Sequence, residues 1–223
     1  MLENHNDLPI SAPFVVQLYD CTERSMVMPF HYRKEQSIFR VISGKVNLTL
    51  NSHSHILEKN DCMIIPSNYV HAVYPLTEGS IYESIIWNAR DLYDLSLGQF
   101  SLIKQLVNHQ IELELFYSKK NAFHITELVR EIFDYARADN ISSTILVTAK
   151  ILEFLGQAAL NENSVIYKKE LMNRYLKYHQ KSLSIFSYIC DNYRRDVTLE
   201  ELSAIVGLSE KYFCKFFKEL TKL

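Results

Sequence analysis

Two groups of side chains in this sequence are placed where they could do chemistry. The first group, His31, Arg33 and His71, combines two imidazoles with a guanidinium inside a run of short predicted strands. Imidazole nitrogens bind metals or exchange hydrogen bonds, whereas a guanidinium is a permanent cation that repels metal ions and pairs with anions. The combination predicts a pocket for a polar or anionic small molecule, with His31, Arg33 and His71 as the effector-binding residues.

The second group lies in the last forty residues, along one predicted helix. Helical spacing leaves a basic edge pointing outward and gathers aromatic and aliphatic residues on the opposite, buried face. A basic helix edge of this kind suits the major groove of double-stranded DNA. The outward residues are Lys211, Cys214, Lys215 and Lys218, and the buried face comprises Tyr212, Phe213, Phe216, Phe217 and Leu220.

Local signals predict the elements that must hold this helix in place. Thr198 is a good N-cap, and Glu201 three residues later completes a capping box. Gly207 supplies the left-handed residue that ends the first helix, and Ser209 caps the second. Residues 198–220 are therefore predicted to form a helix-turn-helix, for which an ordinary helical hairpin is the alternative.

The same segment resembles a known family. The pattern Leu199-Glu-Glu-Leu-Ser-x-x-Val-Gly-Leu-Ser-x-x-Tyr-Phe-x-x-x-Phe-Lys-x-x-Thr221 is similar to the first helix-turn-helix of the AraC/XylS transcriptional regulators. The resemblance covers about forty residues, including a preceding scaffold helix around Phe186 and Ile189. It departs at Ser203, where alanine is usual, and at Lys222, where glycine is usual, so the usual C-terminal helix stop is missing.

The resemblance implies roles for individual residues. Lys211, Cys214 and Lys215 hold the positions of groove-facing side chains, with Tyr212 nearby. A second helix-turn-helix, which the family carries, is absent from these 223 residues. One recognition helix makes few phosphate contacts, so we expect weak or absent specific DNA binding by the monomer. We expect contacts with DNA phosphates from Arg194, Arg195 and Lys218. Backbone amides at the helix starts capped by Thr198 and Ser209 are expected to add to these contacts.

The N-terminal part predicts a β-sandwich or barrel. Between Phe14 and Trp87, short runs alternate apolar and polar residues with a period of two, separated by turns such as Asn51-Ser52. Asn60-Asp61 followed by Pro66-x-Asn68-x-x-His71 resembles the second motif of the cupin barrels, with asparagine replacing both turn glycines. Asparagine best tolerates the positive φ that such turns require.

A metal site is not expected in this barrel. By the resemblance to cupins, His31 and His71 occupy the first and last ligand positions. Arg33 stands where a second histidine would be, and Ser37 where a glutamate would be. Glu35 is displaced from the ligand position. This is a poor ligand set, so neither a metal, another cofactor nor enzymatic activity is expected.

The middle of the chain predicts helices at 121–138 and 142–160, which pack on the barrel. In proteins of AraC type such helices form the dimer contact, so the resemblance implies a homodimer. The fold class expected is α+β: a cupin-like β-barrel, then helices, then an all-α helix-turn-helix domain. The expected domains are a sensor barrel at 1–90, the packing and dimerising helices at 91–164, a linker at 165–180 and an incomplete DNA-binding domain at 181–223.

Composition predicts a soluble, globular, cytoplasmic protein with no membrane association. Hydrophobic residues make up 48% and charged residues 22%, and the polar N-terminus does not resemble a signal peptide. Four widely spaced cysteines form no C-x-x-C pair, which argues against disulfides and zinc. Residues 165–223 carry a net charge of +4 and residues 1–164 a net charge of −6. This distribution fits a DNA-binding domain attached to a sensor domain.

Two hypotheses follow. The first is a dimeric regulator of AraC type that binds double-stranded DNA under the control of a small-molecule effector in the barrel. The alternative is a cupin metal enzyme or ligand-binding module whose helical tail serves assembly. Stoichiometric iron, manganese or zinc in the purified chain would favour the alternative.

Overall fold

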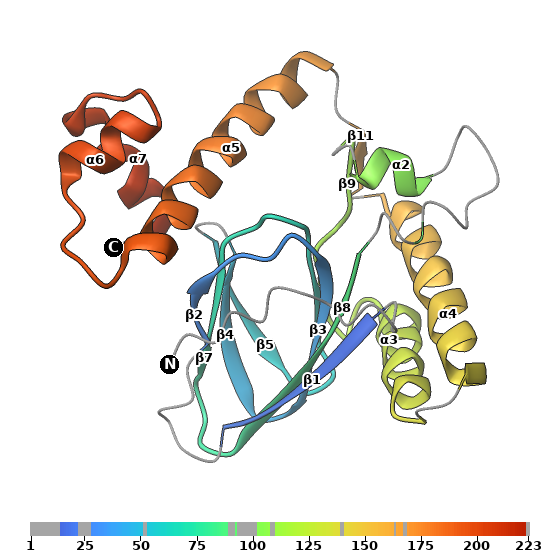
Figure 1. Ribbon diagram of the computed structural model, residues 1–223. Helices are drawn as coiled ribbons and strands as arrows, with labels where there is room; N and C mark the ends of the chain where they lie inside the picture. The colour runs from blue at the N-terminus through green and yellow to red at the C-terminus, as the bar shows by residue number, and fades with distance from the viewer. Residues whose placement is uncertain are drawn as a thin grey trace.

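The protein combines an N-terminal cupin-like β-barrel with helices, an α+β fold (Figure 1). The computed structural model describes residues 14–21, 28–50, 53–88, 92, 102–107, 110–138, 141–162, 164–166 and 169–221. The turn predicted at Asn51-Ser52 lies outside these residues.

The barrel consists of two antiparallel sheets. Period-two runs in the sequence become its strands, because alternate side chains point to opposite faces. One sheet has the order β1 (Phe14–Cys21), β8 (Ser80–Trp87), β3 (Gln36–Ser43), β6 (Cys62–Ile65) and β10 (Phe116–Tyr117). The other has the order β2 (Met28–His31), β7 (His71–Pro75), β4 (Lys45–Leu50) and β5 (His53–Glu58).

Both asparagines of the cupin-like motif adopt the left-handed backbone predicted for them. Asn60 has a φ of 69° and Asn68 a φ of 65°. Asn60 lies in the turn between β5 and β6, and Asn68 in the connection from β6 to β7. The substitution of asparagine for glycine therefore preserves these turns.

Gly44, between β3 and β4, should tolerate no side chain. Its φ is 75°, and a Cβ there would lie 2.5 Å from Ser80 Oγ and 2.9 Å from Ser80 Cα. We expect Gly44→Ala to lower the free energy of unfolding by about 1–3 kcal/mol. Gly156→Ala is the matched control, since a Cβ at Gly156, inside α4, meets nothing within 4 Å. It should be neutral or stabilising by up to about 1 kcal/mol. Urea unfolding of both variants tests this, and equal stability would contradict it.

The five-stranded sheet is buried on both faces. Phe39 and Met63 point between the sheets, together with Leu48 and Val73 of the opposite sheet. Ile38 and Ile64, one residue away from Phe39 and Met63, point outward into a second core. β6 and the central residues of β3 are therefore buried on both faces instead of alternating between buried and exposed.

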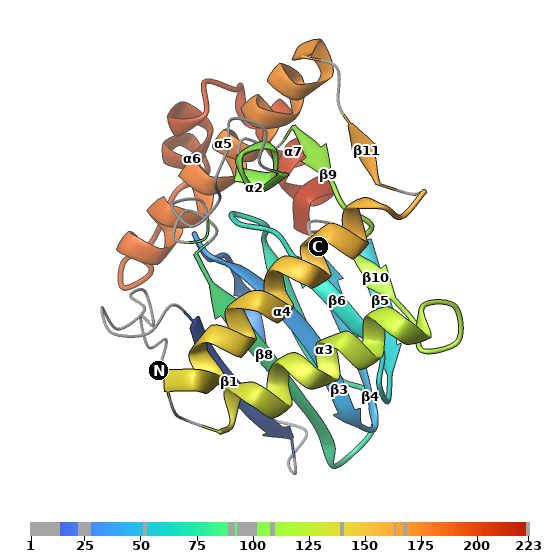
Figure 2. The same cartoon turned by 90° about the vertical axis from the view of Figure 1, so that its right-hand side faces the viewer.

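A helical layer covers the outer face of this sheet (Figure 2). Its main helices are α3 (Phe123–Ala136) and α4 (Ile141–Ala159), which pack on the barrel as predicted from residues 121–138 and 142–160. A short helix, α2 (Leu102–Val107), lies near a small sheet formed by β9 (Ile111–Glu112) and β11 (Val165–Ile166). Among the described residues, no helix has the length and apolarity that crossing a membrane requires.

A buried ion pair links the sheet to the helical layer. Arg40 of β3 donates from Nε to Glu83 Oε1 of β8 at 2.8 Å, and the Glu83 side chain is only 1% exposed. Arg137, immediately after α3, pairs with the other carboxylate oxygen. The Arg40 guanidinium also lies over the Phe133 ring, 5.2 Å from its centroid. The carboxylate thus joins two strands and one helix.

Three helices complete the chain: α5 (Lys169–Asn192), α6 (Leu199–Ile205) and α7 (Glu210–Thr221). They share a core of Ile185, Val206 and Phe213. Two predicted boundaries differ from the elements observed. α5 runs without a break across the linker boundary predicted at residue 180, and β10 adds a strand to the barrel beyond residue 90.

Candidate functional site

The α6–α7 unit has the local geometry predicted for a helix-turn-helix. Glu201 N–H donates to Thr198 Oγ1 at 3.2 Å, and Thr198 N–H donates to Glu201 Oε2 at 3.0 Å, which confirms the capping box. Gly207 has a φ of 61° and ends α6, also as predicted. Ser209 directly precedes the first residue of α7. These turns fix the angle at which α7 leaves α6.

The aromatic side of α7 packs against the rest of the protein. Phe213 and Leu220 are buried, and Phe216 and Phe217 are half-buried against the same clusters. Tyr212 was also expected on this buried face, and that expectation was wrong: its side chain is 69% exposed. Tyr212 directly precedes Phe213 and falls off the buried stripe, which places it beside the basic edge.

The basic edge of α7 faces solvent. Lys211, Cys214, Lys215 and Lys218 are all exposed, as the helical spacing predicts. Lys215 Nζ lies 4.0 Å from Glu219 Oε1, with both side chains more than half exposed. An exposed pair at that distance contributes little, so it does not hold Lys215 away from a ligand. Thr198 and Ser209 are exposed at the starts of α6 and α7.

The two arginines before α6 differ in how they are held. Arg194 is exposed and donates from Nε to its neighbour Tyr193 Oη at 3.3 Å. Arg195 donates from Nη1 to Glu201 Oε1 at 2.9 Å and from Nη2 to Tyr188 Oη at 2.6 Å. These interactions raise the pKa of Arg195 above its usual value. Arg195 therefore connects the end of α5 to α6, which is a structural role in addition to the phosphate contact predicted for it.

The predicted effector residues come together inside the barrel. The rings of His31 and His71, paired across β2 and β7, have centroids 4.1 Å apart. Each ring places Nδ1 on a backbone carbonyl oxygen, His31 on Pro29 at 2.8 Å and His71 on Tyr69 at 2.9 Å. Because Nδ1 donates there, Nε2 of each ring is the acceptor. In the part of the chain that the structure describes, the buried His31 Nε2 has no hydrogen-bond partner.

Burial keeps both histidines neutral. Burial is the main reason that the pKa of His31 falls to about 4 and that of His71 well below its usual 6.5; the Arg33 cation contributes in the same direction, and the hydrogen bond to Pro29 partly opposes the shift at His31. Arg33 donates from Nη2 to Gln17 Oε1 at 3.1 Å. Tyr19 lies on β1, as Gln17 does. Burial raises the pKa of Tyr19, and the Arg33 cation opposes this shift. The cluster thus offers a cation and a neutral imidazole acceptor side by side.

These residues do not suit a divalent metal. Two imidazoles face each other, but the guanidinium of Arg33 is close enough to depress both of their pKa values. Among the described residues, no three His, Cys, Asp or Glu side chains gather in a way that could hold a metal ion. A positive neighbour and a missing third ligand both oppose cation binding.

The barrel and the C-terminal helices meet at a small apolar cluster. Val70 is 1% exposed and packs with Phe186 of α5 and Leu220 of α7. Its neighbours in sequence face elsewhere: Tyr69 hydrogen-bonds Glu112 at 3.3 Å, and His71 faces His31 within the barrel. Three consecutive residues therefore contact three different parts of the protein. This junction was not predicted from the sequence, because the pattern around Val70 indicates only a strand.

Comparison with known families gives a match for the barrel. Residues 23–80 match the family model of the Cupin domain. No helix-turn-helix family model matches the chain. No curated protein matches it either.

The chain is also similar to solved structures at low sequence identity. An RmlC-like cupin from Shewanella frigidimarina is 15% identical with a TM-score of 0.32, over 36% of this chain and 71% of that one. Oxalate decarboxylase from Bacillus subtilis is 23% identical with a TM-score of 0.32, over 36% of this chain and 22% of the decarboxylase. This chain thus spans less than a quarter of that protein. Apo ToxT from Vibrio cholerae is 13% identical with a TM-score of 0.49, over 95% of each chain.

Proposed function

We propose that this chain is a cytoplasmic, non-enzymatic transcriptional regulator of AraC type that binds double-stranded DNA through α7. The observation that supports the proposal is the exposed edge of α7, formed by Lys211, Cys214 and Lys215. The opposite, aromatic face of the helix packs against the protein. A capped turn of fixed geometry holds that helix. Such a unit presents its second helix to the major groove.

The roles proposed for single residues follow from exposure. Lys211 and Lys215 approach base edges, with Tyr212 and Cys214 beside them. Arg194 and Lys218 approach phosphates, and the amides at the starts of α6 and α7 add to these contacts. Arg195 contributes chiefly by fixing α6 against α5, since Glu201 and Tyr188 already engage its guanidinium.

We propose that a small polar or anionic effector binds at His31, Arg33 and His71. The Arg33 cation and the unpaired His31 Nε2 acceptor support this chemistry. Homodimerisation through α3 and α4 is part of the same proposal. The exposed apolar side chains Ile145, Leu146 and Leu152 of α4 are consistent with it.

DNA binding can be tested with the chain as it stands. A duplex selected from a random-sequence library would be compared with a scrambled duplex by fluorescence anisotropy at low salt. We expect Lys211→Ala and Lys215→Ala each to weaken binding of the selected duplex by about tenfold to a hundredfold, because a base contact contributes about 1–3 kcal/mol.

Lys59→Ala is the charge-matched control, since Lys59 is exposed on the barrel between β5 and β6. It should leave the affinity unchanged. Wild-type affinity in both α7 variants would overturn the proposal.

A further inference from the structure

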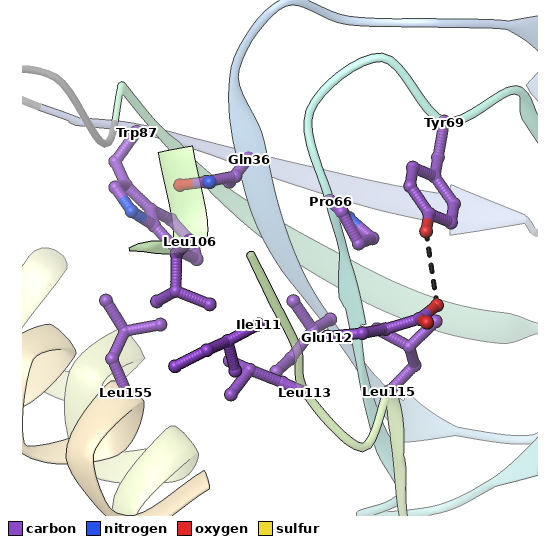
Figure 3. A pocket seen from close by; sticks show the side chains of 11 residues that line it. Gln36, Pro66, Tyr69, Trp87, Leu106, Ile111, Glu112, Leu113, Leu115 and Leu155 are labelled. Carbon is purple, nitrogen blue, oxygen red and sulfur yellow. Dashed lines mark hydrogen bonds between the residues drawn. The ribbon is translucent and has the colours of Figure 1, made fainter. Parts of the chain in front are cut away.

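A cavity lies outside the barrel interior, between the five-stranded sheet and the helical layer (Figure 3). It measures about 550 Å³, including the part open to solvent. His31, Arg33 and His71 do not line it. It is therefore distinct from the proposed effector site.

The wall of the cavity is mainly aliphatic and aromatic. It draws on five separate segments of the chain, so the cavity exists only in the assembled fold. Water is poorly held in such surroundings, whereas an apolar molecule gains by leaving water. The apolar side chains that define it include Ile64, Trp87, Leu106, Ile111, Leu113 and Leu155.

One residue that lines the cavity has a buried hydrogen-bond donor, unpaired within the described part of the chain. Trp87 is 1% exposed, and its buried Nε1–H has no hydrogen-bond partner among the residues that the structure describes. A buried donor left in this way costs about 1–3 kcal/mol, and such groups are rare in folded proteins. Figure 3 places Trp87 and the Gln36 amide at one end of the cavity. A ligand oxygen that reached this edge of the indole would accept the hydrogen bond from Nε1–H.

The opposite end of the cavity limits the charge of a ligand. Tyr69 and Glu112 stand there, joined by a hydrogen bond of 3.3 Å (Figure 3). Among the lining residues that the structure describes, Glu112 is the only acidic or basic one. Its carboxylate repels an anion inside an apolar hollow, where charges are weakly screened.

We infer that this cavity binds a compact, neutral, largely apolar molecule whose carbonyl, ester or ether oxygen accepts a hydrogen bond from Trp87 Nε1–H. The aliphatic wall supplies most of the affinity, and the indole sets the orientation. This site is additional to the proposed DNA and effector functions and does not depend on either.

Trp87 is the only tryptophan of the chain, so its fluorescence reports directly on the cavity. The probes are cyclohexyl methyl ketone and isopropenylcyclohexane, in which a methylidene group replaces the ketone oxygen. Titration of the wild-type chain should give a saturable change in Trp87 emission. The ketone should bind about threefold to tenfold more tightly than the hydrocarbon, the effect of one hydrogen bond.

Three variants locate the binding site. Leu106→Phe fills the cavity from the half-buried helix α2 and should weaken both probes by at least tenfold. Leu76→Phe, at a half-exposed position just after β7 and away from the cavity lining, is its control and should bind as the wild type does. Trp87→Phe, measured by calorimetry, should bind both probes equally because it keeps a ring and loses the N–H. Absence of saturable binding to the wild type, or undiminished binding in a folded Leu106→Phe variant, would overturn the inference. Equal affinity of the wild type for both probes would overturn the role of Trp87.

Discussion

Replacing Glu83 with alanine is expected to lower the free energy of unfolding by about 3–5 kcal/mol. The change leaves the buried Arg40 guanidinium without its carboxylate and detaches Arg137 from the sheet. A buried charge without a partner retains its full cost of desolvation, which the cation–π contact with Phe133 offsets only in part. Equilibrium urea unfolding, followed by circular dichroism, measures the loss.

Glu58→Ala provides the matched control. Glu58 pairs with Lys45 at 2.7 Å, but both side chains are about half exposed and solvent screens the pair, so this loss should be small. Replacing Arg40 and Glu83 together with leucine should destabilise less than Glu83→Ala alone, since no unpaired charge remains. If Glu83→Ala proves no more harmful than Glu58→Ala, the ion pair does not hold the sheet to the helical layer.

Acidification from pH 7 to pH 5 is expected to remove about 2 kcal/mol of unfolding free energy through His31 alone, with a further loss through His71. Burial holds the pKa of His31 at about 4 in the folded protein, against about 6.5 when unfolded, and lowers that of His71 in the same sense. Below pH 6.5 the unfolded chain therefore binds more protons than the folded one. Stability falls with pH by about 1.4 kcal/mol per unit for each histidine. For His31 the loss ends near pH 4.

Urea unfolding at pH 7, 6 and 5 gives the slope. His31→Gln should remove the contribution of one histidine, while His124→Gln should leave the slope unchanged, because His124 is exposed on α3. A slope that His31→Gln does not alter would show that the pair is not buried neutral in solution.

Local signals in the sequence were enough to predict α6, α7 and several tight turns. The capping box at Thr198, the left-handed Gly207 and the positive φ of Asn60 and Asn68 all depend on a few adjacent residues. Each residue type there meets a backbone requirement of its own turn. The barrel strands were predictable for a similar reason, since side-chain alternation is a local property.

Features formed by distant residues were not predictable in this way. Arg40 and Glu83 are 43 positions apart, and no periodicity links them. β9, β10 and β11 have two residues each, too few for any pattern. The cavity at Trp87 needs five segments in register before it exists. α5 also covers the segment before residue 180, which the sequence left open between a linker and a polar connecting helix, because its helical pattern continues through polar residues.

The junction at residues 69–71 has a thermodynamic consequence. Tyr69 borders the cavity, Val70 supports α5 and α7, and His71 belongs to the histidine pair. Linkage between two binding sites is reciprocal. A small molecule that changes the affinity of α7 for an operator by some factor must therefore have its own affinity changed by the same factor when the operator is bound. Operator DNA would then act as an effector of the sensor barrel, and ligand affinities measured with and without duplex would give the coupling energy directly.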